Sequence, residues 1–291
     1  MDNENTSPRN QVNEKKQKLS NNLNKVMKRL RHMAGMAIKD FNMIEDGDKV
    51  MVCMSGGKDS YVLLEVLQSL QRSAPIDFTL IPVHLNGNFP LYPEGLIEDY
   101  LKNTGLEYHI IKEDIYSLLK KTLGESSVCS MCSRLRRGII YKVAKELGVN
   151  KIALGHHADD ILETFFLNLF YGGKLKAMPP KLFTDDEKNI VIRPLAYCRE
   201  ADILKYSRAK NYPIFPKEMC ALVQNKERSN IKDMIKMWDR EYPGRSQIMF
   251  KALKDISLSH LLDTTKYDFT FSSKDLIKDI LDPKSRIIYT Q

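Results

Sequence analysis

Twelve consecutive residues decide the fold, and they read Lys49-Val-Met-Val-Cys-Met54 followed at once by Ser55-Gly56-Gly57-Lys58-Asp59-Ser60. The first half is an apolar run of strand length, and beyond the second half the apolar residues recur at helical intervals. Glycines between a strand and a helix let the backbone turn tightly and point amide N–H groups at an anion, to which the helix presents its positive end. The stretch therefore predicts a strand, an anion-binding loop and a helix.

The same alternation continues along the chain. We expect strands at 78–85, 108–111 and 151–155, and helices at 95–103, 132–147 and 159–170. Strands that alternate with helices predict an α/β fold, a parallel sheet with helices on both faces. Ligands of such sheets bind at the carboxyl ends of the strands. A second polar motif, Gly155-His156-His157-Ala158-Asp159-Asp160, also follows an expected strand.

The ends of the chain differ from this middle part. Residues 1–20 are polar and predict a disordered basic arm, and residues 21–198 hold an amphipathic helix at about 23–41 and then the α/β domain. Residues 199–268 have helical periods and predict a helical region, and residues 269–291 form a tail.

Composition limits the class of protein. The 43% of hydrophobic residues suffice for a real core, and five cysteines are too few for a disulfide framework. Neither a signal peptide nor a membrane span is evident, so we expect a cytoplasmic protein without a membrane partner. Residues 1–40 carry nine Lys and Arg against four Asp and Glu, and residues 199–254 carry thirteen against seven, which favours an anionic partner.

The loop resembles the pyrophosphate loop, Ser-Gly-Gly-x-Asp-Ser, of enzymes that split ATP between the α- and β-phosphates. It differs from the Gly-x-x-x-x-Gly-Lys-Ser/Thr loop of ordinary NTPases. The residue types suit ATP and Mg²⁺: Ser55, Gly56, Gly57 and Ser60 would bind phosphate, Lys58 would add a positive charge, and Asp59 would hold Mg²⁺ or orient the loop. The alternative is a Gly-Gly turn with a Ser/Asp helix cap.

The second motif admits two interpretations as well. His156 and Asp160 could bind Mg²⁺ or position a base, which makes Asp160 a candidate catalytic residue beside Lys58 and Asp59. Alternatively, Asp159 and Asp160 only cap the next helix.

The five cysteines divide into two groups. Cys129 and Cys132 have the two-residue spacing of a zinc knuckle, a redox pair or an iron–sulfur ligand set. Cys53 lies within an expected strand and Cys198 precedes an expected helix, so we expect both in the core. A structural four-cysteine zinc site that recruits Cys198 is the rival interpretation.

Several segments together resemble the tRNA 2-thiocytidine synthetases, over residues 24–269. They are Cys129-Ser-Met-Cys-Ser-Arg-Leu-Arg-Arg-Gly138, the motif that ends at Asp160, Asn168-Leu-Phe-Tyr-Gly-Gly173, Met178-Pro-Pro-Lys-Leu182 and Ile192-Arg-Pro-Leu-Ala-Tyr-Cys-Arg-Glu200. The resemblance implies a [4Fe–4S] cluster bound by Cys129, Cys132 and Cys220, and ATP-dependent thiolation of the cytidine at tRNA position 32. It also implies a cysteine desulfurase as sulfur source and a homodimer.

Two departures from the family pattern stand near the expected site. The family often reads Pro-Cys-x-x-Cys-Gly where this chain has Pro216-Lys217-Glu218-Met219-Cys220-Ala221. It commonly has Leu-Asp-Gln where this chain has Leu85-Asn86-Gly87, which removes a carboxylate at a strand end.

Alternative functions remain open from the sequence. They are a uridine-thiolating enzyme of the same superfamily, an amide or lysidine ligase of the same fold, and a zinc-stabilised RNA-binding module without catalysis. Arg134, Arg136 and Arg137 are equally compatible with tRNA phosphate contacts and with plain solvation.

Overall fold

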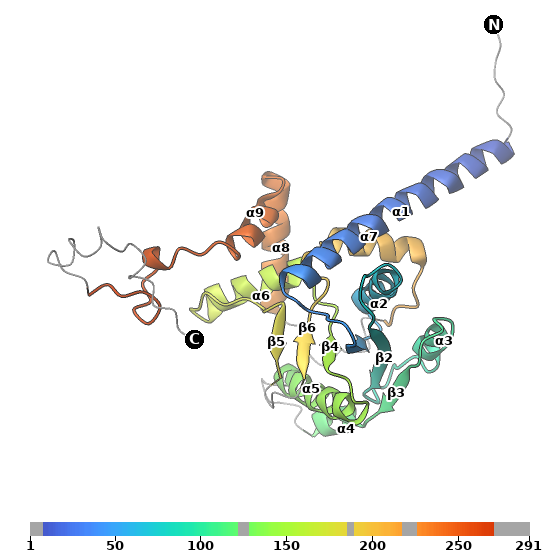
Figure 1. The fold of residues 1–291 in the computed structure, drawn as a ribbon, viewed down its shortest axis with the longest axis horizontal. Coiled ribbons are helices and arrows are strands. Elements are labelled where there is room, and N and C mark those ends of the chain that lie inside the picture. Colours follow the sequence, from blue (N-terminus) through green and yellow to red (C-terminus); the bar gives the residue numbers. More distant parts are fainter. Residues whose placement is uncertain (1–7, 122–127, 185–188, 217–225, 271–291) are drawn as a thin grey trace, which may run out of the picture. The chain divides into compact units, whose positions relative to one another are not determined.

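The computed structural model describes residues 8–121, 128–184, 189–216 and 226–270, with side chains from residue 21 onward except at 128–130. A six-stranded sheet in the order β3-β2-β1-β4-β6-β5 runs through the centre of the first part of the chain (Figure 1). Its strands are β1 Lys49–Met54, β2 Thr79–Asn86, β3 His109–Lys112, β4 Lys151–Ala153, β5 Lys181–Phe183 and β6 Ile190–Ile192. The first five strands of that order pair in parallel, so the predicted fold class is confirmed.

The edge strand β5 differs from the expectation, because it pairs antiparallel to β6. Both strands have three residues, which is too short for a hydrophobic period to mark them in the sequence.

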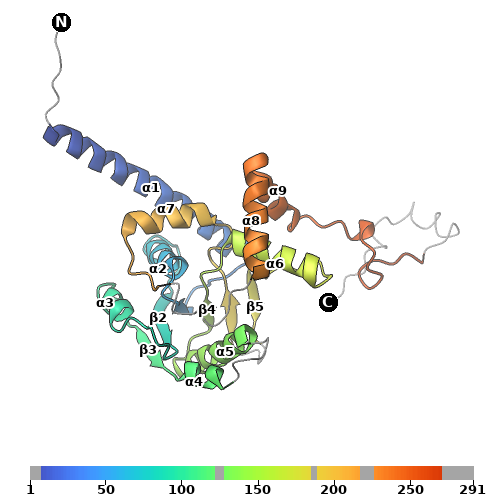
Figure 2. The same ribbon diagram turned by 180° about the vertical axis from the view of Figure 1, so that it is seen from behind.

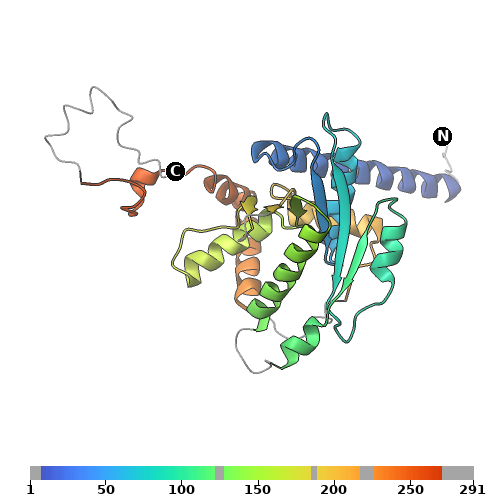
Figure 3. The same cartoon turned by 60° about the horizontal axis from the view of Figure 1, so that its bottom comes forward.

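Helices cover both faces of the sheet (Figures 1, 2 and 3). On one face lies α2 Lys58–Gln71, with α1 Pro8–Asp40 and α7 Glu200–Lys210 packed on it. On the other face lies α5 Val128–Glu146, together with the short α4 Ile115–Lys120. The sequence predicts α5 but not α4. The buried side chains of β1 and β2 that face α5 are Met51, Ile81 and Val83, and they pack with Val143 and Ala144.

The amphipathic helix at the start of the chain is longer than its apolar period. It begins at Pro8, inside the segment for which we expected a disordered arm, because Asn, Glu, Lys and Gln continue a helix without adding apolar residues. The residues of its buried stripe, in contrast, follow the sequence: Val26, Leu30, Ala34 and Ala37 are at most 2% exposed.

The remaining helices are α3 Leu96–Lys102, α6 Ala158–Tyr171, α8 Lys226–Glu241, α9 Arg245–Ala252 and the 3₁₀ turn η2 Leu258–His260. The chain divides into two compact units, residues 1–235 and 236–291, and the division falls within α8. In the second unit, Asp239 accepts a hydrogen bond from the backbone N–H of Ser246 (2.8 Å), and the Arg245 guanidinium stacks on the Tyr242 ring. The boundaries at residues 20, 198 and 268 stay predictions, although α7 packs on α1 and α2 within the first unit.

No helix in the described ranges combines the length and the apolarity that crossing a membrane requires.

Candidate functional site

The phosphate loop lies between β1 and α2, where the sequence places it. Gly56 has φ +80°, a conformation that glycine adopts without strain, and Gly57 is the N-cap of α2. The Ser60 hydroxyl donates to the Gly57 carbonyl (2.8 Å), and the Ser55 hydroxyl accepts from the Gly57 N–H (3.3 Å). The loop is therefore already folded around its own hydroxyl groups, at the amino end of a 14-residue helix.

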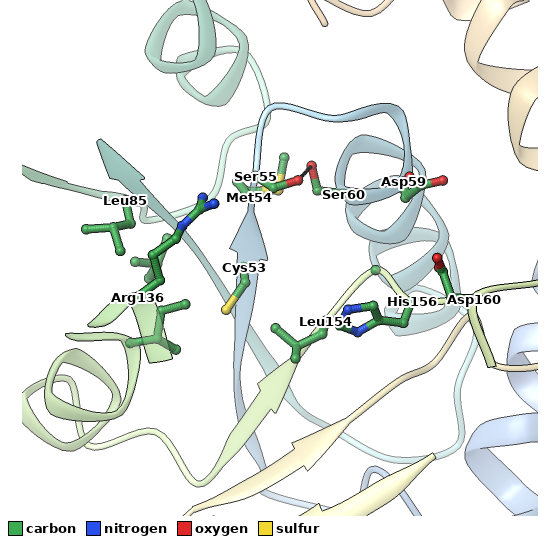
Figure 4. A pocket seen from close by; sticks show the side chains of 13 residues that line it. Cys53, Met54, Ser55, Asp59, Ser60, Leu85, Arg136, Leu154, His156 and Asp160 are labelled. Carbon is green, nitrogen blue, oxygen red and sulfur yellow. Dashed lines mark hydrogen bonds between the residues drawn. The ribbon is translucent and has the colours of Figure 1, made fainter. Parts of the chain in front are cut away.

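A cavity of about 340 Å³ opens beside the loop on the α5 face of the sheet (Figure 4). Three parts of the structure line it. The loop and β1 contribute Cys53, Met54, Ser55, Asp59 and Ser60, the second strand-end motif contributes Leu154, Gly155, His156 and Asp160, and β2 and α5 contribute Val83, Leu85, Arg136 and Ile140. The two motifs that follow strands in the sequence thus meet at one cavity, as expected for the carboxyl edge of a parallel sheet.

The second motif both caps a helix and faces the cavity. His157 is the N-cap of α6: the Asp160 N–H donates to its ring, and its own N–H donates to the Asp160 carboxylate (3.0 Å). Asp159 instead stabilises the start of α7, because its carboxylate accepts from Arg199 (2.9 Å) and from the Glu200 N–H (2.7 Å). The capping interpretation therefore holds for Asp160, which nevertheless lines the cavity.

His156 carries no positive charge at neutral pH. Burial, and next the nearby Arg193 cation, lower the pKa of His156 to about 4. The Arg193 Nε donates to the Nδ1 of His156 (3.3 Å), so the neutral ring keeps its proton on Nε2. The ring is thus a neutral hydrogen-bonding group at the cavity wall.

Lys58 is held by two carboxylates. Its Nζ lies 3.0 Å from Asp59 Oδ1 and 3.1 Å from Glu200 Oε1. Burial alone would lower the pKa of Lys58, but the two carboxylates outweigh it and raise that pKa. Burial likewise opposes ionisation of Glu200, yet Lys232 and Lys58 together hold the pKa of Glu200 at about 2.

This pair belongs to a larger set of alternating charges around the motifs. Arg228 of α8 donates to Asp160 Oδ1 and to Glu163 Oε2, each at 2.8 Å, and Lys232 lies 2.7 Å from Glu200 Oε2. α8 is therefore tied to α6 and α7 by side chains whose positive charge faces the site.

The expected cluster ligands fall mostly outside the described residues. Cys129 lies in α5 but its side chain is outside them, and so is Cys220. Cys132 is partly exposed in the first turns of α5. Among the side chains that the structure does describe, no group of three His, Cys, Asp or Glu forms a metal site.

The other two cysteines differ from each other. Cys198 is 1% exposed, its Sγ lies 3.6 Å from the Leu30 carbonyl, and burial raises its thiol pKa to about 12, so its expected core position is confirmed. Cys53 packs against the core cluster of Met51, Ile81 and Val83, as expected, and it also lines the cavity, because it lies on the same face of β1 as Met51. Burial raises the pKa of the Cys53 thiol to about 12 as well, so it is a poor nucleophile and metal ligand.

Sequence reasoning missed Arg136 as a site residue. Arg136 lines the cavity (Figure 4), whereas Arg134 and Arg137 on the same helix are exposed. A signal was available, since Arg136 follows Cys132 by four residues and therefore lies on the same helix face. Glu200 and Arg193 were also missed, although both lie in a segment that carries the family resemblance.

Asn86, where the family commonly has Asp, is 5% exposed. Its side-chain Oδ1 accepts from the Asn88 N–H (2.9 Å), which fixes the turn after β2.

Comparisons with known proteins agree with this geometry. A family model described as a PP-loop domain matches residues 18–218. The chain is 56% identical over 268 residues to the tRNA-cytidine(32) 2-sulfurtransferase of Actinobacillus pleuropneumoniae serotype 5b, covering 92% of this chain and 84% of that one. It is 55% identical over 272 residues to the protein of that name from Yersinia pestis, covering 93% and 85%.

Among solved structures, the U34-tRNA thiolase NcsA from Methanococcus maripaludis with its [4Fe–4S] cluster has a TM-score of 0.61 to this chain. The match is 23% identical and covers 82% of this chain and 79% of the thiolase, which supports the fold. The sequence relatives show more, because their identity and coverage are high. The chain therefore belongs to the tRNA-cytidine(32) 2-sulfurtransferases, a family of PP-loop sulfurtransferase enzymes.

Proposed function

We propose that this enzyme uses ATP to activate the cytidine at position 32 of tRNA and then replaces its O2 with sulfur. One observation carries the proposal: a single cavity is lined both by the phosphate loop and by α5, the helix that starts with Cys129 and Cys132. A chemistry that joins ATP to sulfur transfer needs these two parts within reach of each other.

The first step forms a bond between the cytidine O2 and the α-phosphorus of ATP, and pyrophosphate leaves. The loop amides, the hydroxyls of Ser55 and Ser60, and Lys58 are placed to bind the leaving pyrophosphate at the positive end of α2. Lys58 would exchange its carboxylate partners for phosphate oxygens. Asp59 and Asp160, which line the same cavity as the loop, would supply carboxylate oxygens for Mg²⁺.

Arg136 and His156 act from the cavity wall. A guanidinium can stabilise the negative charge that grows on the α-phosphate during the attack. The neutral His156 Nε2–H can donate a hydrogen bond without adding charge. The apolar lining of Val83, Leu85, Ile140 and Leu154 offers a surface for a nucleoside ring.

The second step forms a bond between sulfide and C2 of the cytosine, and AMP leaves with the former O2. The donor set suits a [4Fe–4S] cluster, because the helix start beneath Cys129 and Cys132 favours thiolates, whereas Cys53 and Cys198 have raised thiol pKa values. Cys129, Cys132 and Cys220 would hold such a cluster, and with only three cysteine ligands it would be able to bind and supply the sulfur. The NcsA thiolase is described with such a cluster, which supports the assignment.

The tRNA and the sulfur source follow from this chemistry. The base must leave the stack of the anticodon loop to reach a cavity at the sheet edge. A cysteine desulfurase is the proposed source of sulfur, and a homodimer is the proposed assembly.

The test is a reaction of anaerobically purified enzyme with ATP, Mg²⁺, sulfide and tRNA that lacks the modification. AMP and pyrophosphate should form in equal amounts with 2-thiocytidine, and omission of tRNA should abolish all three. Release of ADP, or a protein that binds zinc and no iron, would contradict the proposal.

A further inference from the structure

The phosphate loop is supported on the side away from the cavity by the ring of Phe215. The Phe215 N–H donates to the Gly56 carbonyl (2.9 Å), and Phe215 is 8% exposed. A Cβ atom built on Gly56 would lie 2.4 Å from Phe215 Cδ2. The ring therefore rests directly against the backbone of the loop, in space that any side chain at Gly56 would need.

Two further aromatic side chains fix the ring. The centroid of Phe215 lies 5.5 Å from His84 and 5.4 Å from Tyr92, with both rings nearly perpendicular to it. His84 and Tyr92 stack on each other at 5.7 Å. His84 lies between Val83 and Leu85, which line the cavity, so it points to the opposite face of the sheet.

The same group of side chains is joined to the chain on both sides of the loop. The His84 Nδ1 makes a 2.6 Å hydrogen bond with the carbonyl of Met54, the residue before the loop. Tyr61, the residue after it, donates through its hydroxyl to the Pro213 carbonyl (2.8 Å) and stacks on Tyr212. Residues 212–215 thus contact Tyr61, just after the loop, and are linked through His84 to Met54, just before it.

Gly56 needs such support because of its own conformation. At φ +80° a glycine has no side chain to restrict it, and an unsupported Gly-Gly pair samples many backbone states. A loop that must be ordered by its ligand binds that ligand less tightly than one that is already ordered. The contacts of Phe215 order it before any phosphate arrives.

We propose that Phe215 is a positioning residue that holds the phosphate loop in its nucleotide-binding conformation. This inference rests on the proposed function only for the identity of the ligand as ATP.

The direct test is calorimetric titration of the full-length enzyme with ATP and Mg²⁺ in the absence of tRNA. Phe215→Ala should weaken ATP binding about two- to tenfold, the range expected for loss of aromatic ring contacts. Phe215→Leu, which keeps an apolar side chain against Gly56, should recover most of the affinity. Phe78→Ala is the matched control. Phe78 is also 8% exposed, but it lies just before the amino end of β2, whereas the phosphate loop lies at the carboxyl ends of the strands.

A double-mutant cycle separates positioning from general stability. Gly56→Ala alone should nearly abolish ATP binding, because the new methyl group meets the Phe215 ring. In the Phe215→Ala background the same change should cost less, since only the strain of the positive φ remains. The two losses of ATP affinity should therefore not add. The midpoints of thermal unfolding, in contrast, should fall by similar amounts in Phe215→Ala and Phe78→Ala.

Two results would overturn the inference: equal loss of ATP affinity in Phe215→Ala and Phe78→Ala, or additive losses in the cycle. A different result would reject the proposed function without affecting this inference. A cycle without additivity in an enzyme that makes no 2-thiocytidine would reject that function and keep the role of Phe215.

Discussion

His156 is a residue of the site whose charge depends strongly on burial. Its folded-state pKa of about 4 lies below the ordinary value of 6.5, so the unfolded chain takes up a proton first as the pH falls. The stability that His156 contributes is therefore complete above pH 6.5 and is lost between pH 6.5 and 4. Glu200, with a pKa of about 2 against 4.5, loses its contribution at lower pH, between 4.5 and 2.

We predict that His156→Gln removes part of the acid sensitivity of the enzyme. The free energy of unfolding of the wild type should fall by up to about 3 kcal/mol between pH 6.5 and 4, because the unfolded state binds one more proton there. Glutamine can still accept from Arg193 and does not titrate. Urea denaturation at half-unit pH steps measures the slope, and Glu200→Gln is the control, since it should alter only the region below pH 4.5.

An unchanged slope between pH 6.5 and 4 in His156→Gln would show that another group titrates in that window.

The cysteines give a second prediction at this scale. Cys132→Ala should abolish the iron content of anaerobically reconstituted protein, whereas Cys198→Ala should retain it, because the Cys198 thiol is enclosed beside Leu30. Iron and acid-labile sulfide analysis measures both variants, and Cys53→Ala is expected to retain iron too. Loss of iron from Cys198→Ala as complete as from Cys132→Ala would contradict the assignment of ligands, and zinc without iron in the unmutated protein would favour the four-cysteine zinc alternative.

At the scale of elements, the starts of α6 and α7 depend on each other through Asp159. Its carboxylate accepts the fork of Arg199 and the N–H of Glu200, so one side chain of α6 satisfies the amino end of α7. Glu200 in turn holds Lys58. Through Glu200, the contact between α6 and α7 therefore also fixes the position of Lys58 in the phosphate loop.

We predict that Asp159→Ala lowers the free energy of unfolding by about 1–3 kcal/mol, because it removes the carboxylate that accepts from the partly buried Arg199 and from the backbone N–H of Glu200. Asp99→Ala is the control: Asp99 pairs with Lys102 in an exposed position on α3, and its loss should cost less than about 1 kcal/mol. Equal effects in urea denaturation would mean that the Asp159 contacts add no stability.

The elements show what a sequence can predict and what it cannot. β1 runs from Lys49 to Met54, as its apolar residues predict, because an apolar run of strand length before two glycines is typical of a strand followed by a tight turn. β5, β6 and α4 have three to six residues, so no periodicity marks them. In the site, the motif residues could be found from their types and spacing, and Arg136 from its four-residue distance to Cys132, whereas Arg193 and Phe215 act through three-dimensional neighbours that no local pattern encodes.

For the whole molecule, nucleotide chemistry and cluster binding should be separable by mutation. Lys58→Ala and Asp59→Ala should each lower the rate of AMP formation by about 10²–10³, the scale for loss of a charged group aimed at the transition state. Both variants should keep the iron content of the wild type, because Lys58 pairs with Asp59 and Glu200 and neither residue is an expected cluster ligand. Joint loss of iron and of cooperative unfolding would mean that the loop is structural.

The identity of the modified base is the central claim, and it rests on family membership more than on geometry. Cytosine and uracil share O2 at C2 and differ at position 4, where cytosine carries an amino donor and uracil a carbonyl acceptor. The candidate groups that could tell them apart lie at His156–Asp160 and around Asn86. Mass spectrometry of tRNA nucleosides from cells with and without the gene tests the claim most directly. We expect 2-thiocytidine to disappear on deletion and to return on complementation, whereas retention of 2-thiocytidine with loss of a 2-thiouridine would show that uridine is the substrate.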